Sequence, residues 1–155
     1  MLSVQTLPTI LAGCLLVAAL ADACVSDLRE FRINDRDSVA VVLVFAVLGM
    51  NGLAVQDVAW HMAAAVAVFA IGATLFALGV WGGGDVKLCA ALALLTGFSG
   101  LPRFLLVMAV AGGVVALAVL ALRGRSAGGQ VPYGLAIAAA GIDWAVTNLP
   151  PYWEV

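Results

Sequence analysis

The chain has 155 residues, of which 65% are hydrophobic and only 10% are charged, and its mean hydropathy is +1.14. A soluble domain is about 45–50% apolar and about 25% charged, and a domain of this size has too little interior to bury so much apolar surface. The composition therefore excludes an ordinary soluble domain and predicts a membrane protein in contact with the lipid bilayer. The net charge of −2, without a basic tract, excludes nucleic-acid binding.

The cysteines, Cys14, Cys24 and Cys89, form no C-x-x-C pair and lie in or beside apolar segments. Zinc sites and disulfide frameworks need paired or clustered cysteines, so small buried side chains are the better interpretation here. We expect neither a metal nor another cofactor.

Apolar segments long enough, or nearly long enough, to cross a bilayer recur along the whole chain, and a crossing needs about 20 residues. They are Leu7–Val25, Val39–Val55, Val58–Val80, Val86–Phe98, Phe104–Leu122 and Val131–Val146. Backbone groups in lipid must bond within their own segment, so each segment is expected to be a helix. The pattern predicts an all-α bundle of six transmembrane helices, formed by one domain over residues 1–155. The fourth segment is too short to cross without local thinning of the bilayer or a connection below its surface.

Basic residues predict how this bundle is oriented in the membrane. Six of them fall in or beside the first, third and fifth connections, and only Arg103 falls on the other side. The six are Arg29, Arg32, Arg36, Lys87, Arg123 and Arg125. Short cytoplasmic loops carry the excess of Lys and Arg, so both termini are expected to face outward from the cytoplasmic membrane.

An aspartate follows three glycines at the start of the fourth segment, in Gly82-Gly83-Gly84-Asp85-Val86-Lys87. Consecutive glycines disfavour helix and let another part of the backbone come close. Asp85 stands where a helix N-cap would, at the positive end of the helix and near the membrane surface. A plain capping aspartate is the alternative, although a triple-glycine loop beside hydrocarbon is an unusual way to make one.

A second aspartate, Asp27, follows the first segment and is expected on the same membrane face as Asp85. By itself it would be interpreted as a solvated loop charge. Placing an ionisable group near hydrocarbon costs free energy, and such groups are often functional. We therefore interpret the two acids together as a functional pair.

Three motifs resemble those of the type IV prepilin peptidases, in matching order along nearly the whole chain. Gly82, Gly84 and Asp85 fill the positions of the family's G-x-G-D motif. Asp27, with Arg32 and Ile33 after it, is similar to the first catalytic aspartate and its basic-Ile-Pro-Asn stretch. Val131-Pro132-Tyr133-Gly134 resembles the motif that opens the last helix. One motif is moderately specific, and the three together are highly specific.

The resemblance implies an aspartic endopeptidase that removes the leader peptide from pilin precursors at the cytoplasmic membrane face. It implies Asp27 and Asp85 as the catalytic pair, with Gly82, Gly83, Gly84, Lys87, Pro132 and Tyr133 as supporting or substrate-binding residues. Pilus assembly machinery is a further possible partner.

The chain also departs from the family pattern. Asn34 and Asp35 stand where Pro and Asn are expected, which alters the local turn but leaves the catalytic position intact. The large N-terminal extension with paired C-x-x-C motifs, found in members that also methylate the new N-terminus, is absent. The chain therefore resembles the short, peptidase-only branch associated with tight-adherence (Flp-type) pili, and no methyltransferase activity is expected.

Two carboxyls in one partly dehydrated site cannot both ionise easily, so they are expected to share a proton. The ionised member can take a proton from the attacking water, and the neutral member can donate to the scissile carbonyl. Asp85, at a helix N-terminus, is the more readily ionised in this hypothesis. Lys87 either stabilises developing charge or extends its ammonium group to the membrane surface.

The remaining polar residues are expected to be structural. Glu30, Asp35 and Asp37 are expected to be solvated, and Asp22 and Asp143 to be satisfied by neighbours. His61 is expected at the outer membrane interface, away from the two aspartates.

Two other functions fit parts of the pattern. Intramembrane proteases of the presenilin and signal-peptide-peptidase kind also carry G-x-G-D, but their first aspartate lies in a Tyr-Asp motif within a span, whereas Asp27 follows Ser26. A small transporter or assembly subunit could contain a glycine-broken helix, but would be expected to have midplane polar groups and repeat symmetry.

Overall fold

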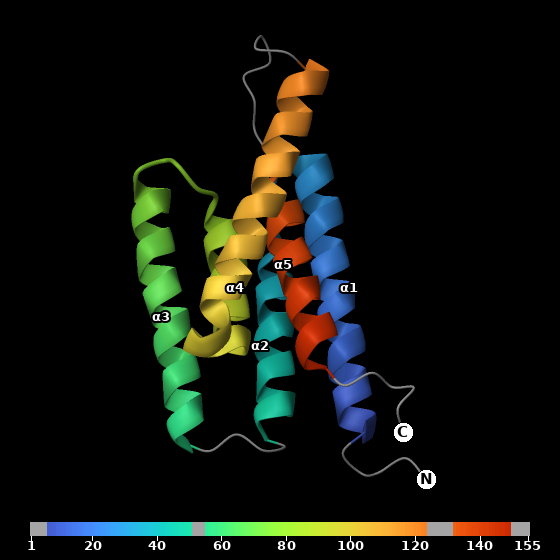
Figure 1. Ribbon diagram of the computed structural model, residues 1–155, viewed down its shortest axis with the longest axis vertical. Helices are drawn as coiled ribbons and strands as arrows, with labels where there is room; N and C mark the ends of the chain where they lie inside the picture. The colour runs from blue at the N-terminus through green and yellow to red at the C-terminus, as the bar shows by residue number, and fades with distance from the viewer. Residues whose placement is uncertain (1–5, 51–54, 124–131, 150–155) are drawn as a thin grey trace.

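The computed structural model describes residues 6–50, 55–123 and 132–149, and these residues form helices without any strand (Figure 1). The helices are α1 (Thr6–Glu30), α2 (Asp35–Gly49), α3 (Val55–Ala77), α4 (Gly83–Arg123) and α5 (Tyr133–Asn148). For the described part of the chain, the prediction of an all-helical protein is confirmed.

Three stretches of helix are long and apolar enough to cross a membrane: Leu7–Glu30, Asp57–Ala77 and Gly83–Leu122. Helix α2, with 15 residues, and helix α5, with 16, are shorter than the roughly 20 residues of a full crossing. The described helices therefore support a membrane protein, whereas six separate spans are not supported.

The fourth and fifth predicted segments lie in one helical element, α4, which is broken at Gly97. This glycine has φ +63° and ψ 179°, a backbone conformation almost restricted to glycine. Figure 1 shows the chain turning back at the break, so that residues 83–96 and 98–123 of α4 run in opposite directions. One residue thus replaces the longer connection expected between the two segments.

His61 of α3 supports this break, and its expected place at the outer membrane interface stays a prediction. It is half-buried, and its Nδ1–H donates to the carbonyl oxygen of Leu94 at 2.7 Å. A broken helix leaves carbonyl groups without partners, and His61 satisfies one of them. Its ring also lies against Gly97 and against Phe45, whose ring centroid is 5.4 Å away.

The first part of α4 passes through the centre of the bundle. Leu88, Cys89, Leu92 and Ala93 are at most 1% exposed there, among neighbours from α2, α3 and α5. Small residues let the helices approach closely: a Cβ on Gly72 of α3 would lie 2.8 Å from Val86. The short segment that follows the glycine run is therefore the most buried helix of the described fold.

We expect Gly97→Ala to lower the free energy of unfolding by about 1–3 kcal/mol, because an L-residue is strained at this φ and ψ. The added Cβ would also lie 2.8 Å from the His61 ring. Thermal unfolding in detergent micelles measures the effect. Gly113→Ala is the matched control, since no atom lies within 4 Å of a Cβ at that position of α4. An unchanged melting temperature for Gly97→Ala would contradict this account of the break.

Candidate active site

Asp27 is a buried residue of α1, not a solvated charge in a loop. The helix continues past the predicted end of the segment at Val25 to Glu30, and Asp27 is 5% exposed. The backbone N–H of Gly134 donates to Oδ2 of Asp27 at 2.7 Å. A buried carboxyl oxygen is thus held by the first turn of α5, a segment more than 100 positions later in the chain.

The first turn of α5 can reach Asp27 because residue 134 has no side chain. A Cβ on Gly134 would lie 2.8 Å from Cβ of Asp27 and 2.9 Å from its Oδ2. Gly134 ends the motif Val131-Pro132-Tyr133-Gly134, but it is not among the site residues predicted from the sequence. The signal that could have identified it is a glycine in the first turn of a helix, where it has little local purpose.

Pro132 and Tyr133 open α5 but do not line the cavity at the aspartates. Pro132 is buried at the N-cap position, and Tyr133 is 42% exposed. These two predicted supporting residues therefore start α5, the helix whose Gly134 contacts Asp27, and they do not themselves line the cavity.

Asp85 lies in the first turn of α4, which begins at Gly83, three residues before the predicted start of the segment at Val86. It is therefore inside the helix and not at the N-cap. The amide of Val86 donates to the carbonyl of Gly82 at 3.1 Å, which closes this first turn. Glycines can join a helix where tertiary packing outweighs their weak propensity for it, and here they do.

The glycines before Asp85 differ in how much room surrounds them. A Cβ on Gly82 would lie 2.7 Å from Oδ2 of Asp85, and one on Gly84 would lie 2.7 Å from the carbonyl oxygen of Ile33. The nearest atom to a Cβ on Gly83 belongs to Phe76, at an ordinary 3.4 Å. The two glycines that the G-x-G-D pattern specifies are therefore the two at which an added Cβ would meet another atom within 3 Å, the Asp85 carboxylate at Gly82 and a backbone oxygen at Gly84.

The loop between α1 and α2 has its own unusual backbone. Phe31 has φ +51°, and its N–H donates to the carbonyl of Asp27 at 3.0 Å. Positive φ is uncommon for a residue with a bulky side chain and often occurs at functional sites. This turn directs residues 32–35 across the start of α4.

Asp27 and Asp85 line one cavity of about 550 Å³. Apart from these two residues, its lining comes from the α1–α2 loop, the first residue of α2, and residues 82–87 at the start of α4: Phe31, Arg32, Ile33, Asn34, Asp35, Gly82, Gly83, Gly84 and Lys87. The structure thus brings together both predicted catalytic residues and four of the six predicted supporting residues. We call this cavity the aspartate pocket.

Lys87 is paired with Asp35 at the edge of the aspartate pocket. Its Nζ lies 2.7 Å and 2.8 Å from the two carboxylate oxygens of Asp35. Both side chains are partly exposed, so the pair contributes only about 0–1 kcal/mol to stability. Asp35, expected to be solvated, is exposed but bound to the cation that was expected to support the site.

The prediction that Asp37 is solvated is wrong, because it is 3% exposed at the α1–α2 interface. Its Oδ2 has no hydrogen-bond partner among the described residues. Burial raises the pKa of Asp37, the nearby Asp22 carboxyl raises it further, and Arg36 partly opposes these effects. Asp22 itself is satisfied by Arg36 at 2.6 Å, as expected.

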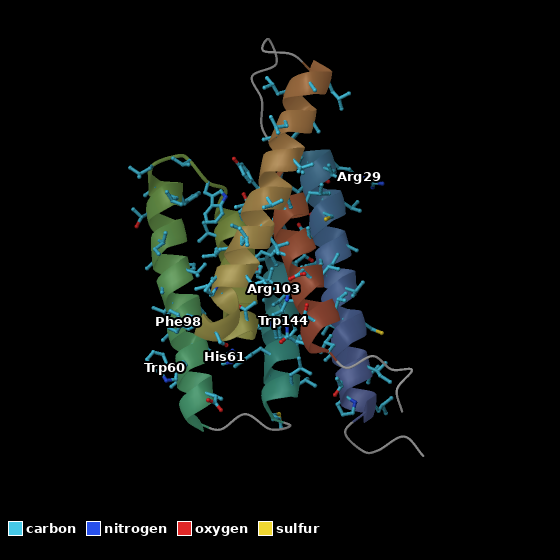
Figure 2. The ribbon with its side chains drawn as sticks, viewed as in Figure 1. Arg29, Trp60, His61, Phe98, Arg103 and Trp144 are labelled. Atoms are coloured by element: carbon cyan, nitrogen blue, oxygen red, sulfur yellow. The ribbon has the colours of Figure 1, made fainter. Side chains whose placement is uncertain are left out.

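Arg103 and Asp143 form a two-pronged ion pair with both N–O distances at 2.8 Å, joining α4 to α5. Figure 2 shows Arg103 well away from Arg29, the labelled residue at the end of α1 near Asp27. The expectation that Asp143 is bonded within the bundle is confirmed, and this pair is separate from the aspartate pocket.

Comparison with known families shows to which family the chain belongs. The family model described as the type IV leader peptidase family matches residues 14–117, about two thirds of the chain. The chain belongs to the type IV leader peptidase family. No curated protein and no solved structure matches it. Within this leader peptidase, the matched range includes Asp27 and Asp85 but ends before Gly134 and the start of α5.

We expect Gly84→Ala to impair the peptidase more than Gly83→Ala. The Cβ at position 84 would press on the backbone of Ile33 and separate the α1–α2 loop from α4, whereas position 83 has ordinary space. Cleavage of a precursor protein by each purified variant, with thermal unfolding measured in parallel, tests this difference. Equal activity and equal melting temperatures would contradict the importance of the close approach.

The raised pKa of Asp37 predicts a pH-dependent stability. Its protonated form is favoured in the folded protein, so its contribution is fully present below the unfolded pKa of about 3.9 and is lost as the pH rises through the folded pKa. Asp37→Asn removes this titration and should raise the melting temperature at pH 7.5 more than at pH 4. The exposed Asp57→Asn serves as control. A melting-temperature change that is the same at both pH values would overturn the prediction.

Proposed function

We propose that this leader peptidase is an aspartic endopeptidase that cuts pilin precursors, using Asp27 and Asp85 as a catalytic pair. The observation that carries the proposal is that Asp27 of α1 and Asp85 of α4 line one pocket. One carboxyl accepts a proton from the attacking water, and the other donates to the carbonyl oxygen of the scissile peptide bond.

The surroundings of the two aspartates suit a pair of groups that act as acid and base. Asp27 is 5% exposed and has one oxygen bound by a backbone N–H, which fixes its orientation. Asp85 lies against Gly82 in a first turn whose start has little steric bulk, leaving access for an extended peptide. Precise positioning of acid and base accounts for a large part of such catalysis.

The pocket would open at the cytoplasmic face of the cytoplasmic membrane, in a topology with six crossings and both termini outside. Support comes from the basic residues: Arg32 and Lys87 line the pocket, and Arg29 lies at the same end of α1 (Figure 2). In this topology the break at Gly97 separates the fourth crossing from the fifth. Residues 83–96 span only about 20 Å, so the pocket would lie below the membrane surface.

The proposed substrate is a precursor of the Flp-type pilins, in which a short basic leader precedes a long apolar helix. This class of substrate is supported by the resemblance of the chain to the short, peptidase-only branch of the family. Three carboxyls (Asp27, Asp35 and Asp85) and two cations (Arg32 and Lys87) line the pocket, so polar partners of both signs are available to a charged leader at the cut.

Asp27→Asn and Asp85→Asn should each reduce precursor cleavage by about 10²–10⁴-fold, the usual contribution of one acid–base group. Asparagine keeps the shape of the side chain but cannot exchange the proton. Cleavage in reconstituted membranes, followed by gel shift of the precursor, measures the loss. Glu30→Gln, at an exposed carboxyl near the same helix end, should remain active. Full activity of either Asp variant would refute the assignment.

A further inference from the structure

An apolar groove continues from the aspartate pocket along the membrane-embedded surface. It is a cavity of about 510 Å³ between α2 and α3, with the first part of α4 as its floor. Asp35 and Lys87 line both this groove and the aspartate pocket. The groove therefore begins where the polar pocket ends.

The walls of the groove are large apolar side chains, and its floor is made of small ones. The wall residues are between 43% and 63% exposed: Val39, Val42, Val66 and Phe69. Ala90 and Ala91 of α4 form part of the floor. Small residues at such a position allow the backbone of another helix to come close.

The groove exists because α2 and α3 do not pack along each other. Among the described residues, α2 packs on α1 and α4, while α3 packs on α4, so the two consecutive helices stand apart on one floor. Figure 1 shows the first part of α4 between α3 and α2.

At the end of the groove far from the aspartates, a ring contact joins α2 to α3. Leu94 lines the groove there, and its carbonyl accepts the hydrogen bond from His61. The His61 ring also contacts Phe45 of α2, bridging the two walls. Figure 2 shows His61 toward the end of the molecule opposite Arg29. The other end of the groove, at Asp35 and Lys87, meets the aspartate pocket.

We propose that this groove is the docking site for the apolar helix of the protein substrate, which it holds with the helix N-terminal side at the aspartate pocket. The inference rests on the proposed function and adds the surface that positions the substrate. A helix is about 10 Å wide, and the floor from Lys87 to Leu94 is about 10 Å long, enough for about two turns. The residues just before that helix then reach Asp27 and Asp85 without entering hydrocarbon.

This arrangement explains how one site can take both parts of an amphipathic substrate. The apolar helix stays in a groove lined by apolar side chains, where its backbone hydrogen bonds remain within the helix. The scissile bond, which must leave the helix to be attacked, lies in the polar pocket. The Asp35–Lys87 pair marks the boundary between the two environments.

Filling the groove from its exposed wall tests the proposal with little risk to folding. Val66→Trp should raise the KM for a full precursor about tenfold, equivalent to about 1.4 kcal/mol of lost binding, while kcat changes little. Ile71→Trp is the matched control, because Ile71 is on the same helix, is 64% exposed against 63% for Val66, and does not line the groove. Val42→Trp and Leu43→Trp give a second pair on α2.

Photo-crosslinking gives an independent readout. A benzophenone amino acid is placed at Val66 or, as control, at Ile71 in the Asp85→Asn protein, which is mixed with precursor in liposomes. Crosslinks from position 66 should map to the apolar segment directly after the cleavage site, and those from position 71 should not. Lipid adducts alone at position 66, with normal KM in Val66→Trp, would overturn the groove proposal.

These outcomes separate the two proposals. If the Asp27→Asn and Asp85→Asn variants are inactive while Val66→Trp cleaves with an unchanged KM, the groove assignment fails and the catalytic pair stands. If an Asp variant stays fully active, the proposed function itself fails.

Discussion

The fold around the two carboxyls depends on close approaches at two glycines, Gly84 and Gly134, where a side chain would have no room. Gly84 brings the start of α4 against the carbonyl of Ile33, and Gly134 brings the start of α5 against Asp27. A methyl group at either position would meet atoms at less than 3 Å. These contacts join three helix ends and a loop into one polar pocket in a protein whose other surfaces are mostly apolar.

The position of the pocket follows from the central helix. The first part of α4 is buried from Leu88 to Leu95, so its N-terminal turn has a fixed place relative to α2, α3 and α5. Asp85 lies at the start of this helix, and Asp27 lies on α1, which packs on both α2 and α5. Rigid helices on several sides are the kind of scaffold that catalytic side chains need. The break at Gly97, held by His61, ends this central helix and lets the chain return along it.

How far the sequence predicts this structure depends on whether a feature is local. The G-x-G-D pattern and the acid after the first apolar segment led to Asp27 and Asp85, and the structure places them in one pocket. The helical content followed from hydropathy. By contrast, the reversal at Gly97 has no local signal beyond one glycine among many, and hydropathy alone separated α4 into two segments.

The error for Asp37 has the same origin, since its burial depends on α1, a different helix. The contact between His61 and Leu94 was not predicted, because a single histidine near a segment end does not reveal that a carbonyl of another helix lies within reach.

The junction of a polar pocket with an apolar groove is a physical requirement for any enzyme that cuts beside a membrane helix. A peptide bond cannot be hydrolysed while its carbonyl is bound within a helix in hydrocarbon, because exposing that backbone to lipid costs several kcal/mol. The cost falls when the unwound residues find polar partners at the membrane surface. The Asp35–Lys87 pair is located where such an exchange would occur, since both residues face the pocket on one side and the groove on the other. Its weak, exposed ion pair can open at little cost, so a substrate's own charges can replace either partner.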